Sequence, residues 1–199
     1  MGRVLKPGPY LSPLLLGEPM ETYVALLRGI NVGGKNKIVM AQLKEVFIKA
    51  GFKDVQTYIN SGNIIFAASG QSEAALQEEC RKIIYARFKL DIAVALISAQ
   101  ALAEALANAP SWWDNDEEAK HNAIFIIAPA EAAAILKDVG QAKENYEQVA
   151  AYGQVIFWSA PLKTFNHTRW SKVASTSAYG SITIRNANTA KKLLSLVKG

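Results

Sequence analysis

The stretch Thr22-Tyr23-Val24-Ala25-Leu26-Leu27 opens the pattern that decides the fold. It carries no charge, contains several residues that favour β-structure and ends just before a glycine-rich loop, residues 29–36. Such a run is typical of a buried strand. Residues 40–50 then repeat apolar side chains at helical spacing, and Gly51 stands where a helix commonly ends in a glycine. The chain therefore begins with a strand followed by a helix.

The pattern continues with a hairpin, a helix and a further strand. Residues 54–59 and 64–66 predict two strands joined by the turn Asn60-Ser61-Gly62-Asn63. Residues 72–88 predict an amphipathic helix with Ser72 at its N-cap, and residues 91–97 predict a strand. The order β-α-β-β-α-β predicts a ferredoxin-like unit, or α/β-plait, whose two helices cover one face of a four-stranded antiparallel sheet.

The same order returns in the second half as a repeat of pattern only, with no clear residue identity between the two halves. It comprises strands at 123–127 and 182–185, a hairpin of 144–150 with 154–159, and helices at 129–138, 168–177 and 188–197. We therefore predict an α+β protein made of two consecutive ferredoxin-like units, each an antiparallel sheet with helices on one face. The predicted parts are a disordered N-terminal extension (1–19), the first unit (20–98), a helical connector (99–120) and the second unit with an extra C-terminal helix (121–199).

The predicted topology gathers polar residues at one end of the first sheet. Right-handed crossovers place the end of the first strand and the turn of the hairpin at the same end. The loop 29–36 and the turn 60–63 should therefore be neighbours. The candidate ligand-binding residues of this loop cluster are Arg28, Asn31, Gly33, Gly34, Lys35, Asn60, Ser61 and Asn63.

The loop cluster favours a binding module for an anionic small molecule or a nucleotide. Gly29 to Lys35 has the spacing of a phosphate-binding P-loop, but Asn36 stands where that motif needs a hydroxyl. The predicted helix also starts only near Met40, so its N-terminus does not follow the lysine directly. What remains is a weaker anion site made of backbone N–H groups and Lys35. The alternative is a glycine loop that only reverses the chain.

Composition excludes several classes of function. The 199 residues contain one cysteine, Cys80, and two histidines, so neither an intramolecular disulfide nor a structural zinc site can form. We expect no metal and no cofactor. No run approaches the roughly 20 apolar residues of a membrane-spanning helix. Four prolines interrupt residues 1–19, which argues against a signal peptide. We therefore predict a cytoplasmic protein without membrane contact, and its oligomeric state stays open.

The charge distribution supports two alternative functions. The net charge is +5, and no acidic residue follows position 147. A basic surface formed by Arg169, Lys172, Arg185 and Lys191 would favour nucleic-acid binding through phosphate contacts, although it also fits a solvated basic face. The other alternative is an enzyme without a prosthetic group that uses Lys35, Ser61 and Arg28.

Three stretches together resemble the bacterial DUF1697 family, a domain of unknown function. They are Leu26-Leu27-Arg28-Gly29-Ile30-Asn31-Val32-Gly33-Gly34, Tyr58-Ile59-Asn60-Ser61-Gly62-Asn63 and Thr183-Ile184-Arg185-Asn186-Ala187-Asn188-Thr189. The resemblance implies a pair of ferredoxin-like units and a start near Met20. It implies no activity, because none is established for the family.

Overall fold

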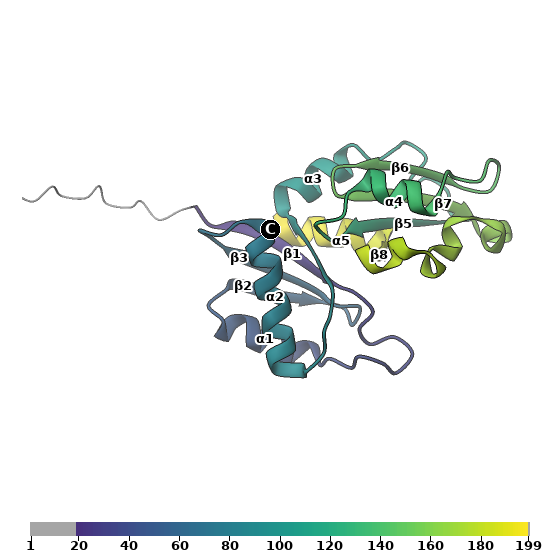
Figure 1. Ribbon diagram of the computed structural model, residues 1–199. Coiled ribbons are helices and arrows are strands. Elements are labelled where there is room, and N and C mark those ends of the chain that lie inside the picture. Colours follow the sequence, from purple (N-terminus) through teal and green to yellow (C-terminus); the bar gives the residue numbers. More distant parts are fainter. Residues whose placement is uncertain (1–18, 199) are drawn as a thin grey trace, which may run out of the picture.

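The computed structural model describes residues 19–198, so the predicted N-terminal extension lies outside the described residues except for Pro19. The first unit has the predicted order of elements, and its strands form one antiparallel sheet in the order β2-β3-β1-β4. Its elements are β1 (Glu21–Leu27), α1 (Met40–Lys49), β2 (Lys53–Tyr58), β3 (Asn63–Ala68), α2 (Glu73–Phe88) and β4 (Val94–Ser98) (Figure 1). Ser72 caps α2 as predicted, because its side chain accepts a hydrogen bond from the Ala75 backbone N–H.

The second unit repeats this topology after the connecting helix α3 (Ala99–Ala107). Its sheet has the equivalent strand order β6-β7-β5-β8 and is again antiparallel. Its elements are β5 (Ala119–Ile126), α4 (Ala132–Val139), β6 (Gln148–Tyr152), β7 (Val155–Pro161), β8 (Ile182–Asn186) and α5 (Ala187–Lys198). The prediction of two ferredoxin-like units in an α+β protein is therefore confirmed.

The helix predicted for residues 168–177 is present only as short 3₁₀ turns and not as one continuous helix. The chain between β7 and β8 forms three such helices, of which η2 lies within the predicted range: η1 (Leu162–His167), η2 (Trp170–Ser175) and η3 (Ser177–Ser181). The segment is rich in hydroxyl side chains that bond to backbone carbonyls three residues earlier; Ser175 donates to Lys172 and Thr176 donates to Val173. Such local bonds compete with the hydrogen-bond ladder of an α-helix and favour short 3₁₀ turns.

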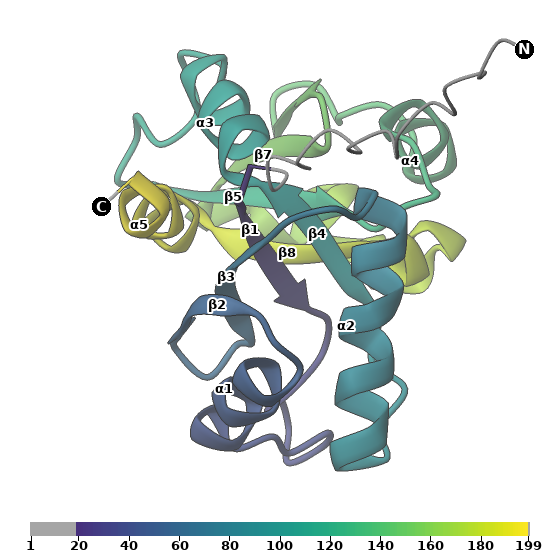
Figure 2. The same cartoon turned by 90° about the vertical axis from the view of Figure 1, so that its left-hand side faces the viewer.

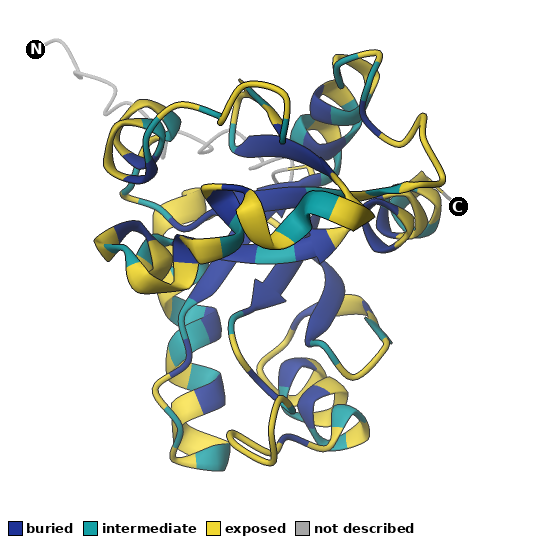
Figure 3. Cartoon of the chain, turned by 90° about the vertical axis from the view of Figure 1, so that its right-hand side faces the viewer, coloured by how far each residue is buried: buried dark blue, intermediate teal, exposed yellow. Residues whose placement is uncertain are grey.

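The two sheets pack face to face, and a shared core joins the units. Along β1 the side chains alternate: Tyr23, Ala25 and Leu27 point toward α1 and α2, whereas Val24 and Leu26 point toward the second sheet. The strands of one sheet cross those of the other (Figure 2), and buried residues continue across the boundary between the units (Figure 3). Because both faces of the central strands are buried, these strands are apolar throughout rather than alternating.

Helices cover the outer faces and one side of the shared core. The helices α1 and α2 pack on the first sheet, whereas α4 and the 3₁₀ segments pack on the second. From α3 and α5, Leu102 and Leu193 reach into the core between the sheets. Cys80 on α2 is fully buried, and burial raises the pKa of its thiol. This cysteine therefore behaves as a small apolar side chain.

Candidate functional site

The predicted neighbourhood of the glycine-rich loop and the hairpin turn is confirmed. The Asn31 amide Nδ2 donates to the Asn60 carbonyl at 2.9 Å, and the Leu27 backbone N–H donates to the Gly62 carbonyl at 2.8 Å. Gly62 has a φ of +85°, and a Cβ there would lie 2.6 Å from the side chain of Ile30. Only glycine fits this close approach of the two segments.

Several side chains of the loop cluster form hydrogen bonds to other protein groups and so hold the loops in place. Asn31 also donates to the Ile38 carbonyl at 3.0 Å and accepts from the Ile38 N–H at 2.9 Å. Arg28 donates to the Tyr179 carbonyl at 3.0 Å, with its guanidinium carbon 5.3 Å from the centre of the Tyr179 ring. Asn63 donates to the Tyr58 carbonyl and to the Ser61 hydroxyl oxygen. These contacts give Arg28, Asn31 and Asn63 a structural role.

The centre of the loop cluster is filled by Arg185 from the second unit. Its Nε donates to Asn63 Oδ1 at 2.6 Å, and Nη2 donates to the carbonyls of Leu27 and Ser61, each at 2.9 Å, and of Gly62 at 3.2 Å. Its Nη1 donates within β8, to the Thr183 hydroxyl and the Ile184 carbonyl. One side chain of β8 therefore joins the second sheet to the hairpin turn and to the end of β1 in the first.

Arg185 is buried, and among residues 19–198 no carboxylate is one of its hydrogen-bond partners. Its exposed fraction is 6%, and all its hydrogen bonds go to neutral oxygen atoms. Burial lowers its pKa to about 10, so the guanidinium is still protonated near neutral pH. The five N–H donors of a guanidinium suit such a ring of acceptors, which replaces the water lost on burial.

The prediction that Arg185 belongs to a basic surface is therefore wrong, because the packing of the two sheets buries this side chain. Lys191 is exposed but forms an ion pair with Asp114. Arg169 and Lys172 are exposed at the 3₁₀ segment η2, as a basic surface requires. Only these two of the four predicted residues remain as exposed charges that form no ion pair within residues 19–198.

The exposed remainder of the loop cluster borders a shallow groove. Gly33, Gly34 and Lys35 are exposed, and Asn60 is exposed beside them. The groove has a volume of about 450 Å³ and is lined by Asn31, Gly34, Lys37, Ile38, Val39, Met40 and Asn60. Ile59, at its border, has a φ of +49°, a left-handed conformation that strains a β-branched residue.

A larger cavity lies in the second unit, between the end of the connector, the start of β5 and the start of α5. Its volume is about 900 Å³. Most of its lining residues are polar: Asp114, Asn115, Asp116, Glu117, Lys120, His121, Asn122, Asn186, Asn188 and Lys191. The pairing of β5 with β8 stops at Asn122, because the chain leaves β8 for α5 after Asn186. The edge of β5 at residues 119–121 that would face β8 therefore has no paired strand, and the cavity lies along it.

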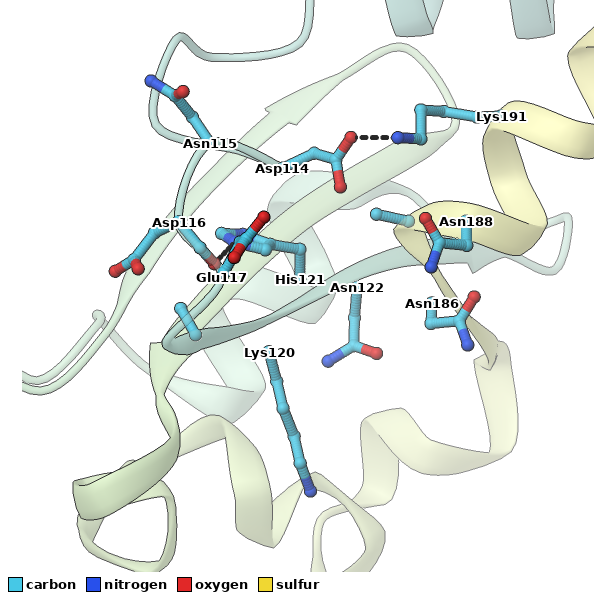
Figure 4. A pocket seen from close by; sticks show the side chains of 12 residues that line it. Asp114, Asn115, Asp116, Glu117, Lys120, His121, Asn122, Asn186, Asn188 and Lys191 are labelled. Carbon is cyan, nitrogen blue, oxygen red and sulfur yellow. Dashed lines mark hydrogen bonds and ion pairs between the residues drawn. The ribbon is translucent and has the colours of Figure 1, made fainter.

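Three of the four asparagines that line this cavity come from β5, β8 and α5. Asn122 and Asn186 are cross-strand partners on β5 and β8, and Asn188 lies beside them in the first turn of α5 (Figure 4). Asn186 Oδ1 accepts the Thr189 N–H and so caps α5. Within residues 19–198, the amides of Asn122 and Asn188 form no hydrogen bond to another residue. The Asp114–Lys191 ion pair lies on one side of the three amides (Figure 4). Lys120 projects from the same face of β5 as Asn122, and its ammonium lies 4.1 Å from the centre of the Phe165 ring.

Sequence reasoning missed this group of amides. Asn186 and Asn188 lie in one of the stretches that carry the family resemblance, but Asn122 is more than 60 positions away in the sequence. Its place beside Asn186 follows only from the register between β5 and β8, which no local pattern determines. Within residues 19–198 no group of His, Cys, Asp or Glu could hold a metal ion, and no helix is long and apolar enough to cross a membrane.

Comparison with known proteins gives a family and a structural relative. The family described as "Protein of unknown function (DUF1697)" matches residues 20–157. The structure of the conserved bacterial protein SP0830 from Streptococcus pneumoniae is similar, with 31% sequence identity and a TM-score of 0.81, over 90% of this chain and 99% of that one. No curated protein matches the sequence.

Proposed function

The chain belongs to the DUF1697 family of proteins of unknown function, and from that premise we propose that it is a binding module that takes up a small polar molecule in the cavity of Asn122, Asn186 and Asn188. The observation that carries the proposal is that these three carboxamides, which come from β5, β8 and α5, all line one cavity of about 900 Å³. Concave sites with a few convergent polar groups are where small molecules commonly bind.

The cavity suits an uncharged ligand with adjacent hydrogen-bond donors and acceptors. Each carboxamide offers an acceptor oxygen and two N–H donors on one group. The cavity is lined by three carboxylates, Asp114, Asp116 and Glu117, against two lysines, Lys120 and Lys191, so an anion would meet a slight net negative charge. A sugar or a nucleoside presents donors and acceptors in adjacent pairs, and we propose this class of ligand.

Replacing Asn122 or Asn188 with Ala should abolish ligand binding without unfolding the protein. A ligand at ten times its Kd stabilises the folded state by about 1.4 kcal/mol, which raises the melting temperature by about 3–6 °C for a chain of this size. The measurement is a thermal-shift screen of neutral sugars and nucleosides. Asn166→Ala serves as the control, because Asn166 is exposed and away from this cavity. A screen without any shift, or a shift that survives both cavity variants, would contradict the proposal.

Anion binding at the loop cluster is a second candidate function. The observation that favours it is the exposure of Lys35 and Lys37 beside the groove of Asn31, Gly34 and Asn60. Support for nucleic-acid binding is weaker, because Arg185 is buried and Lys191 is paired. Support for an enzyme based on Arg28 and Ser61 is also weaker, because both contact other protein groups.

The double variant Lys35→Ala, Lys37→Ala should weaken pyrophosphate binding at least about tenfold, because two cations near one anion each contribute of order 1 kcal/mol at the surface. Titration calorimetry at low salt measures the affinity, which should fall further at high salt. Lys82→Ala on α2 is the matched control, since Lys82 is exposed and lies on a helix that does not line the groove. Equal affinities of the double variant and the control would eliminate this candidate.

A further inference from the structure

Three side chains stand in one row across the second sheet. His121 on β5 lies opposite Ser159 on β7, and Ser159 lies opposite Gln148 on β6. Directly opposed residues of antiparallel strands project from the same face, with their Cβ atoms roughly 5 Å apart. Ser159 and His121 share the face of Phe157 and Ala123, which packs toward the first sheet. The row is therefore fixed by backbone pairing and not by mobile loops.

The hydrogen bonds of His121 direct its unprotonated ring nitrogen toward the Ser159 hydroxyl. The imidazole Nε2 lies 2.8 Å from the Asp116 carbonyl oxygen, and Nδ1 lies 2.6 Å from Ser159 Oγ. A carbonyl oxygen can only accept, so Nε2 carries the proton. In the neutral ring Nδ1 then accepts the hydrogen bond that the Ser159 hydroxyl donates. This is the arrangement in which a histidine activates a serine as a nucleophile.

A separate cavity of about 340 Å³ opens onto this pair. Trp112, Tyr146 and Pro161 give it apolar walls, and Gln148 also lines it. Only 5% of Ser159 is exposed, so the hydroxyl is shielded from bulk water at the cavity's base. The cavity shares Asp116, Ala119 and His121 with the larger cavity but is lined by none of Asn122, Asn186 and Asn188. The inference below therefore does not depend on the ligand proposed above.

We propose that Ser159 is the nucleophile of an acyl-transfer site that hydrolyses small esters, with His121 as general base and Gln148 as an oxyanion donor. Ser159 Oγ bonds to the ester carbonyl carbon while its proton moves to His121 Nδ1. The Gln148 amide N–H donates to the oxyanion that forms. The bond to the alcohol oxygen then breaks, and the alcohol leaves with the proton from Nδ1. Water repeats the sequence on the acyl-serine, which releases a carboxylic acid and restores Ser159.

The same geometry limits the substrates. In a Ser-His-Asp triad, a buried carboxylate stabilises the imidazolium that forms. Here the Asp116 carbonyl orients the ring but carries no full negative charge. The imidazolium is therefore less stabilised, and esters with good leaving groups are expected to react whereas amides are not. The small volume and aromatic walls favour a short apolar acyl group.

The test is covalent labelling of the full chain with a fluorophosphonate probe, alongside hydrolysis of p-nitrophenyl butyrate. The probe loses fluoride to an activated serine, so we expect one adduct, mapped by mass spectrometry to Ser159. Ser159→Ala should abolish the adduct and reduce ester hydrolysis to the buffer rate. His121→Gln should slow labelling by about 10²-fold, and Gln148→Ala should slow ester hydrolysis by about 10²-fold. Ser195→Ala, on the surface of α5, should change neither.

Two outcomes would overturn the proposal. One is a wild-type protein that hydrolyses the ester while the probe leaves Ser159 unlabelled. The other is a folded Ser159→Ala variant, with an unchanged melting transition, that keeps the wild-type rate. Should Ser159→Ala fail to fold, the adduct map of the wild-type protein decides alone: an adduct on Ser159 supports the proposal, and its absence rejects it.

Discussion

Replacing Arg185 with Met should lower the free energy of unfolding by about 3–5 kcal/mol, a large part of the roughly 5–15 kcal/mol that stabilises an ordinary domain. Methionine fills much of the same space but donates no hydrogen bond. Asn63 Oδ1 and the carbonyls of Leu27 and Ser61 would lose the donor that Arg185 now provides. Buried acceptors without a donor each cost about 1–3 kcal/mol. Urea denaturation monitored by fluorescence measures the change.

A second substitution at Arg185 separates charge from geometry. Lysine keeps the positive charge, but its single ammonium cannot reach acceptors that now surround three different nitrogen atoms. Arg185→Lys should therefore lose most of the stability that Arg185→Met loses. Lys192→Met on the exposed side of α5 is the control, with an expected change within about 0.5 kcal/mol. A loss below about 1 kcal/mol in Arg185→Met would show that the guanidinium does not hold the sheets together.

The architecture could be predicted because its signals are local. Ser72 marks the start of α2 with its own side chain, and the hairpin turn 60–63 brings its two strands together. The shared core is harder to predict. The apolar runs of β1 and β4 show that both faces are buried, but no local signal says what covers the second face. The covering surface includes Phe125 and Phe157, which lie 101 and 133 positions after Val24 of β1.

The candidate site was predictable only in part, because contacts between the two units leave no local signal in the sequence. The neighbourhood of loop 29–36 and turn 60–63 follows from the topology of one unit, and the structure confirms it. Arg185 suggested a basic surface, because charged side chains are rarely buried. Its true position depends on how the two sheets pack, which lies beyond a single unit. The three-residue row of His121, Ser159 and Gln148 likewise requires the register of β5 against β7.

Glu147 is a second buried charge, and it holds the second unit's hairpin to its 3₁₀ segments. Its exposed fraction is 7%. Oε1 accepts the backbone N–H groups of Lys143 at 3.0 Å and Arg169 at 2.7 Å. Oε2 accepts the indole N–H of Trp158 and the backbone N–H of Trp170, both at 3.1 Å. Four N–H groups therefore replace the water that would otherwise solvate this carboxylate.

Glu147→Ala should lower the free energy of unfolding by about 3–4 kcal/mol, because it leaves four N–H donors without their acceptor in a buried place. Glu147→Gln has nearly the same volume, yet its NH₂ group would face two N–H donors at one of the two oxygen positions. The free energy of unfolding of Glu147→Gln should therefore fall by at least about 2 kcal/mol, although the side-chain volume in the core is almost unchanged. Urea denaturation of both variants, with the exposed Glu144→Gln as control, measures these losses. If Glu147→Gln were as stable as the wild type while Glu147→Ala was not, packing rather than hydrogen bonding would explain the role of this residue.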